Sequence, residues 1–148
     1  MIIEFFVPGI PKTAGSKRAF INKKTGRPII TDDCKTGKDW KADIKAFALK
    51  VFKDNPHRGP VIIEMRFIFG RPGYHYGIGR NAGTLKPQYA LVQHTKKPDI
   101  DKLSRAVLDG LTGIIWHDDS QIYKKLCIKT YGGKPGVDIR IKTLGKEK

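Results

Sequence analysis

The segment that decides the fold runs from Lys97 to Arg105, with the sequence Lys-Pro-Asp-Ile-Asp-Lys-Leu-Ser-Arg. Pro98 disfavours a helical conformation for the residue before it, and Asp99 is a favourable N-cap for a helix that begins after it. Apolar residues then recur at helical spacing, at Ile100, Leu103, Val107 and Leu111. The pattern therefore predicts an amphipathic helix over residues 99–111, which the glycines that follow would close.

A charged stripe lies beside the apolar face of this predicted helix. At about 100° per residue, Asp101, Arg105 and Asp109 fall within an arc of about 80°. Two further acids follow in the segment His117-Asp118-Asp119-Ser120, although the chain has only 14 acidic residues against 29 lysines and arginines. Carboxylates gathered on a polycationic chain indicate a site for a hard cation such as Mg²⁺.

Each of these residues also has a purely structural interpretation. Asp99 and Asp101 suit the positive end of a helix dipole without any chemistry. Arg105 and Asp109 have the spacing of an ordinary surface ion pair, and Asp118-Asp119 is typical of a turn before a strand. The sequence alone leaves these alternatives open.

The segment Lys97-Pro-Asp-Ile-Asp-Lys-Leu-Ser-Arg-Ala-Val-Leu-Asp, followed by Asp118-Asp119-Ser-Gln-Ile and then Lys129, resembles the RusA family of Holliday-junction resolvases. The family signature is K-P-D-x-D-N-L-x-K, then a helix and a D-D-x-Q-[IV] segment, and the detailed resemblance covers residues 96–129. It implies that Asp99, Asp101 and Asp119 bind the catalytic metal, Mg²⁺ or in its place Mn²⁺. Lys102 stands where the family has asparagine, and Arg105 stands where it has lysine. Arginine keeps the positive charge but does not readily exchange a proton.

The resemblance also implies an activity and a partner. We expect a Mg²⁺-dependent endodeoxyribonuclease of DNA recombination and repair, which resolves four-way junctions by paired nicks that leave a 5′-phosphate and a 3′-hydroxyl. It implies a homodimer, because a C₂ dimer presents two equivalent sites to opposed strands. Two alternatives stay open: a catalytically silent, basic nucleic-acid-binding protein, and a nuclease of flaps or other branched nucleic acids with the same site.

Composition agrees with a polyanionic partner. The 148 residues suit one domain, and the net charge of +15 predicts binding to nucleic acid. We expect no membrane span, no signal peptide and no small-molecule cofactor, and hence a cytoplasmic protein. Cys34 and Cys127 are far apart and lack the spacing of a zinc site, and a disulfide is not expected in a reducing compartment.

The rest of the chain predicts an α+β domain with one mixed sheet and two main helices. We expect a strand over residues 2–7, a hairpin over 18–31, a helix over 36–52 and an alternating strand over 61–69. Two final strands, 121–131 and 137–143, are predicted to form a second hairpin, and the tail from residue 145 to be frayed. A capping box at Thr36–Asp39 would start the first helix, whose aromatic stripe we assign to the core.

Residues 70–98 are rich in glycine and interleave basic with aromatic residues. We expect a flexible, substrate-gripping arm here, although a plain insertion, and a further strand within residues 87–95, remain open. Lysines near the first hairpin have the alternative role of keeping an edge strand soluble. The residues predicted to contact DNA phosphates are Lys12, Lys17, Arg18, Lys23, Lys24, Arg27, Arg71, Arg80, Lys96, Lys97 and Lys102.

Overall fold

A computed structural model describes the backbone of residues 1–13, 17–21, 23–32 and 37–145, and the side chains of these residues except 17–21, 28–32 and 37–38. The strands are β1 (Ile2–Pro8), β2 (Lys17–Ile21), β3 (Pro28–Asp32), β4 (Val61–Phe69), β5 (Ile122–Tyr131) and β6 (Gly136–Thr143). The helices are α1 (Gly37–Val51) and α2 (Ile100–Leu111), with four 3₁₀ turns, η1 (Gly73–His75), η2 (Gly79–Asn81), η3 (Pro87–Tyr89) and η4 (Asp119–Gln121). The predicted α+β class is confirmed.

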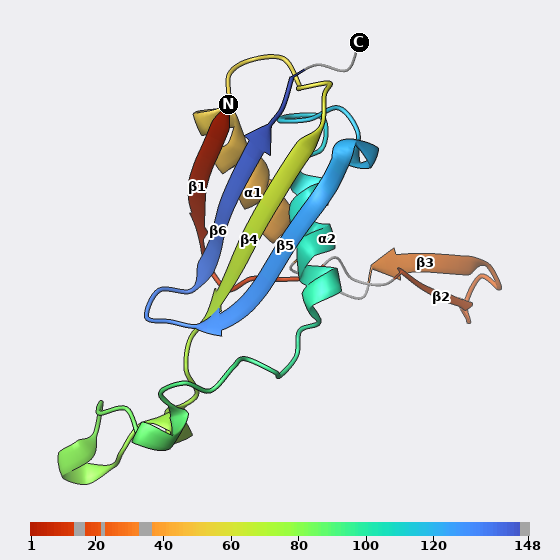
Figure 1. The fold of residues 1–148 in the computed structure, drawn as a ribbon. Helices are drawn as coiled ribbons and strands as arrows, with labels where there is room; N and C mark the ends of the chain where they lie inside the picture. The colour runs from red at the N-terminus through yellow and green to blue at the C-terminus, as the bar shows by residue number, and fades with distance from the viewer. Residues whose placement is uncertain (14–16, 22, 33–36, 146–148) are drawn as a thin grey trace.

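The main sheet has the strand order β1-β6-β4-β5. β6 pairs antiparallel with β1 on one side and with β4 on the other, whereas β4 and β5 are parallel. The prediction that the last two strands form a hairpin is therefore wrong, because β4 lies between them. The reason is that β5 is reached from β4 by a crossover through α2, which leaves the far side of β4 for β6 (Figure 1).

Both helices cover one face of this sheet, and the core lies between them (Figure 1). Alternation along β4 turns Val61, Ile63, Met65, Phe67 and Phe69 inward, as their period of two requires. From α1 the core receives Trp40, Ile44 and Ala48, and Phe52 joins them directly after the helix. This confirms the core assignment of the stripe, although Val51 is exposed. From α2 it receives Leu103, Ala106, Val107 and Leu111.

The first predicted hairpin forms a separate two-stranded sheet of β2 and β3 rather than part of the mixed sheet. The capping box proposed at Thr36–Asp39 lies partly outside the described residues, as does the end of the tail. The first helix ends at Val51, before the Asn55-Pro56 stop that the sequence suggests. In the parts of the chain that the structure describes, no helix is long and apolar enough to cross a membrane.

Residues 70–98 leave the end of the sheet as an arm that returns to the start of α2 (Figure 1). The arm contains three 3₁₀ turns, and the alternative of a strand within residues 87–95 is wrong, since that segment begins with η3, makes a turn at residues 90–91 and then has no regular secondary structure. Its base is an aromatic cluster: His75 stacks on Tyr89 at 4.3 Å between ring centroids, and His94 stacks on Phe69 at 4.4 Å. Tyr131 of β5 contacts both histidines.

Candidate active site

Asp99 and Asp101 lie together at the N-terminal end of α2. Asp99 is the N-cap residue, with φ −64° and ψ 138°, but its side chain makes no capping hydrogen bond. Asp101 is in the first helical turn and is exposed. Among the described residues neither carboxylate has a hydrogen bond or an ion pair, so capping does not account for Asp99. Mg²⁺ commonly takes one or two carboxylates from a protein, its other ligands being phosphate and water oxygens, and Asp99 and Asp101 supply two unsatisfied carboxylates only two residues apart.

The backbone before these acids is held by Lys129 of β5. Its ammonium group donates hydrogen bonds to the carbonyl oxygens of Lys96 at 2.7 Å and of Pro98 at 3.0 Å. A second lysine of the same strand, Lys125, donates to the hydroxyl of Ser104 on α2 at 3.2 Å. β5 therefore fixes the start of α2 with two cationic side chains.

Asp118 and Asp119 have different roles in η4. Asp118 caps the turn: its carboxylate accepts from the backbone N–H of Ser120 at 2.9 Å, while the Gln121 side chain accepts from the Asp118 backbone N–H at 2.7 Å. The hydrogen bonds from Ser120 hold the pKa of the Asp118 carboxyl below its usual value. The turn interpretation is therefore confirmed for Asp118.

Asp119 is held through one of its carboxylate oxygens. Its Oδ1 accepts a hydrogen bond from the indole Nε1 of Trp116 at 2.9 Å. The Thr112 hydroxyl also lies within hydrogen-bond distance of this Oδ1, and shares its single proton with the carbonyl oxygen of Leu108 at 2.7 Å. Trp116 is fully buried, so its indole group is a rigid donor. A carboxylate that is oriented through one oxygen and keeps the other free resembles the way in which protein metal ligands are positioned.

The three predicted metal ligands do not come together within one chain. Asp119 is hydrogen-bonded to Thr112, the C-cap of α2, whereas Asp99 is the N-cap. α2 has 12 residues, which corresponds to about 18 Å along its axis. Accordingly, no group of three histidines, cysteines or acids suited to a metal occurs in the described residues.

Arg105 is exposed on α2 and free for a ligand as far as the described side chains extend. The alternative of an Arg105–Asp109 surface pair is not what the structure shows, because Asp109 pairs instead with Lys41 of α1 at 3.5 Å. The charged stripe is therefore divided: Asp109 joins the two helices, while Asp101 and Arg105 face solvent.

The predicted phosphate-binding residues fall into four groups. Lys23, Lys24, Arg27, Arg80, Lys96 and Lys97 are exposed, and Lys12 and Lys102 are half-buried. The side chains of Lys17 and Arg18 lie outside the described residues. Arg71 is engaged in the arm, where its guanidinium donates to the carbonyl oxygens of Tyr89 at 2.7 Å and Ala90 at 3.3 Å.

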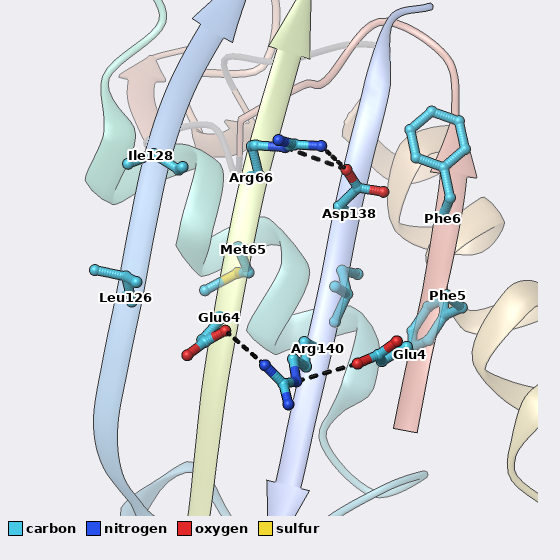
Figure 2. Close-up of a pocket in the computed structure, with 11 residues that line it drawn as sticks. Glu4, Phe5, Phe6, Glu64, Met65, Arg66, Leu126, Ile128, Asp138 and Arg140 are labelled. Atoms are coloured by element: carbon cyan, nitrogen blue, oxygen red, sulfur yellow. Dashed lines mark hydrogen bonds and ion pairs between the residues drawn. The ribbon is translucent and has the colours of Figure 1, made fainter. Parts of the chain in front are cut away.

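The open face of the sheet has a hollow of about 490 Å³ that none of the site aspartates lines (Figure 2). Its charged residues are paired with one another: Arg66 with Asp138 at 2.8 Å, and Arg140 with Glu4 at 3.1 Å and Glu64 at 3.9 Å. Three acids and two arginines make this surface locally non-cationic, although the chain carries +15. The candidate site is therefore assigned to the α2 end, where the unsatisfied carboxylates lie, and not to the hollow.

Comparison with known proteins gives the family. The family model described as endodeoxyribonuclease RusA matches residues 8–142. The chain belongs to the RusA family. It is also 28% identical over 140 residues to the uncharacterized protein YqaN of Bacillus subtilis (strain 168), with 95% of each chain covered.

RusA membership makes the protein an endodeoxyribonuclease and supports the resolution of Holliday junctions. The sequence did not predict three residues that position the site: Lys129, Trp116 and Thr112. Lys129 is among the residues that resemble the family. Its position in the sequence does not indicate, however, that its side chain binds the backbone of residues 96–98. Trp116 and Thr112 precede the Asp-Asp pair by a few residues, and only the fold of residues 112–119 turns them toward Asp119.

Proposed function

We propose that this RusA-family protein is a divalent-metal-dependent endonuclease that resolves four-way DNA junctions by paired nicks and acts as a homodimer. The observation that carries the proposal is the pair of unsatisfied carboxylates, Asp99 and Asp101, at the start of α2 on a chain of charge +15. Because neither carboxylate is used by the fold, both are available for a ligand.

Asp99 and Asp101 are the residues of one chain that would hold Mg²⁺ or Mn²⁺. When bound, the metal supplies a water molecule of lowered pKa and positive charge for the oxygens of the scissile phosphate. Arg105 lies one turn after Asp101 and is exposed, so its guanidinium is available to bind a non-bridging phosphate oxygen. Lys129 keeps the backbone of residues 96–98 in place and thereby orients Asp99.

Branched DNA fits the distribution of charge around this site. Exposed cations occur on the arm at Arg80, before the motif at Lys96 and Lys97, and at the tip of the β2–β3 hairpin. The hollow with the paired arginines also holds three acids, which makes it a less favourable surface for phosphates. We infer that DNA lies along the α2 end of the molecule and leaves the open face of the sheet free.

The test is cleavage of a synthetic four-way junction by the purified protein with Mg²⁺, with Mn²⁺ and with a chelator, against a linear duplex of the same sequence. We expect nicking of the junction only with metal. Asp99→Asn and Asp101→Asn should abolish nicking while junction binding survives or tightens, because each removes negative charge beside phosphates.

Asp109→Asn is the matched control, since it removes an acid from the same helix that is already paired with Lys41. It should cleave like the parent. Binding without metal-dependent nicking by the parent would favour the silent binding protein, and preferential cleavage of flaps would favour the other branched-DNA nuclease.

A further inference from the structure

The arm of residues 70–98 exposes apolar side chains that the fold does not use. Among the described residues, the two most exposed large apolar side chains are Leu91, at 91%, and Ile78, at 89%. Ile78 precedes η2, which lies at the far end of the arm, and Leu91 follows η3, nearer the sheet (Figure 1). Single exposed apolar residues are common on protein surfaces, but two that are almost fully exposed on one projecting segment indicate a contact surface.

The backbone of the arm holds these side chains outward. The loop at the tip is closed by a hydrogen bond from the backbone N–H of Gly77 to the carbonyl oxygen of Thr84 at 2.9 Å. Nearer the sheet, the Arg71 guanidinium donates to the carbonyl oxygen of Ala90 at 3.3 Å, directly before Leu91. Both apolar side chains are therefore attached to a backbone that is already ordered, which lowers the entropy cost of binding a ligand.

The charge of the arm favours nucleic acid as the partner. Its 29 residues contain five lysines and arginines and no acid. Arg80, two residues after Ile78, is exposed, and so are Lys96 and Lys97. The arm continues directly into Asp99 of the candidate site. A DNA strand bound at the carboxylates would therefore meet cations along the arm as well.

A cationic arm with apolar side chains fits branched DNA better than a regular duplex. In a duplex the apolar faces of the bases are stacked on one another, and the outside presents phosphates and the edges of the bases. At a branch point this stacking is interrupted, so that base faces become accessible. Proteins that enter base stacks use apolar side chains such as isoleucine and leucine as wedges, together with cations that bind the DNA around them.

We propose that Ile78 and Leu91 contact unstacked base pairs at the branch point and thereby make the protein prefer junctions to duplex DNA. The cations of the arm and of the motif bind phosphates in either kind of DNA, so they give affinity without this preference. The inference rests on the proposed function and names the feature of the branched substrate that the arm recognises.

Equilibrium binding to a synthetic four-way junction and to a duplex of the same sequence tests the proposal, in a chelator so that neither is cut. Burial of one isoleucine or leucine side chain corresponds to about tenfold or more in affinity. We expect Ile78→Ser and Leu91→Ser each to weaken junction binding about tenfold, and to leave duplex binding and thermal stability unchanged. The conservative variants Ile78→Leu and Leu91→Met should retain the affinity for the junction.

Two controls separate this effect from others. Leu49→Ser removes a leucine of α1 that is 53% exposed, and it should bind both DNAs like the parent. Arg80→Gln should weaken binding to junction and duplex alike and reduce the slope of log affinity against log salt by about one. The serine variants of the arm should keep the parental slope, because they remove no charge.

Fluorescence gives a readout that does not depend on affinity. 2-Aminopurine is placed at the branch point, where its emission rises as the base loses its stacking. At saturating protein we expect the parent and Leu49→Ser to raise the emission, and the Ile78→Ser, Leu91→Ser double variant not to do so. The same rise with the double variant would overturn the proposal.

The binding data have further outcomes that would overturn it. Unchanged junction affinity of the double variant would do so, as would equal losses for junction and duplex. A changed oligomeric state of the free double variant, with junction binding intact, would assign the two side chains to a second copy of the chain instead. Because binding is measured without cleavage, a parent that prefers the junction through these residues but does not nick it would contradict the proposed function alone.

Discussion

Lys129 should control activity without touching the substrate, and Lys129→Met tests this. The substitution keeps most of the side-chain volume and removes the ammonium group that donates to the carbonyl oxygens of Lys96 and Pro98. A hydrogen bond from a charged group contributes about 1.5–3 kcal/mol. Because Lys129 is half-buried and water replaces part of what is lost, we take about 1.5 kcal/mol for the two bonds together.

This free energy sets two expected effects. For a domain of this size it lowers the melting temperature by about 3–6 °C. If the same free energy holds Asp99 in its productive position, the single-turnover cleavage rate falls about tenfold. Junction affinity should change far less, since one cation among 29 lysines and arginines is lost.

Lys124→Met is the matched control, because it removes the same charge from an exposed position of the same strand. The assays are thermal unfolding, single-turnover cleavage of a four-way junction and equilibrium binding of that junction. If Lys129→Met cleaves within twofold of both the parent and Lys124→Met, the hydrogen bonds of Lys129 to the carbonyl oxygens of Lys96 and Pro98 do not position the site.

Arg105→Ala should reduce the single-turnover cleavage rate by about 10²–10³, as loss of a transition-state donor does, and leave stability unchanged. Arg105→Lys should retain much of the rate. A cleavage rate of Arg105→Ala within threefold of the parent would refute the role of Arg105. Gly110→Ala should lower the free energy of unfolding, measured in urea, by about 1 kcal/mol. The added Cβ would lie 2.9 Å from the Cγ2 of Ile44, and the strain of overpacking exceeds the gain in helix propensity. A more stable variant would contradict this close packing. Burial lowers the pKa of both His75 and His94, with Arg71 and Lys129 as further causes, so each should titrate below about 6.5 by NMR. Because the unfolded chain then binds more protons, the stability that these neutral rings provide is complete above about pH 6.5 and is lost as the pH falls toward the lowered pKa of each histidine. A titration midpoint at or above pH 6.5 would contradict the burial of that ring.

The local elements followed from the sequence because their patterns are strong. β4 alternates over nine residues, and α2 has both a start signal and an apolar period, so each needs only its own residues to be recognised. The strand order did not follow in the same way. The short turn before β6 suggested a hairpin with β5, but β4 lies between the two strands. Which strands pair depends on tertiary contacts, and no local sequence pattern indicates it.

The candidate site was predictable in part for a similar reason. Asp99 and Asp101 are two residues apart in the sequence, so their proximity at the start of α2 follows from local geometry alone. Asp119 belongs to the same family motif, yet its place depends on the path of residues 112–118, which stay at the far end of the helix. The resemblance names residues that act together, but it does not say whether they belong to one chain.

Cleavage of a supercoiled plasmid that extrudes a cruciform tests whether the protein is a metal-dependent dimeric junction resolvase. Paired nicks made within one binding event convert the plasmid to the linear form, whereas independent single nicks give the open circle. The account predicts linear product with Mg²⁺, little accumulated open circle and no cleavage with a chelator or by Asp101→Asn. Open circle as the main product, or linear product that forms equally well without metal, would contradict a metal-dependent dimeric junction resolvase.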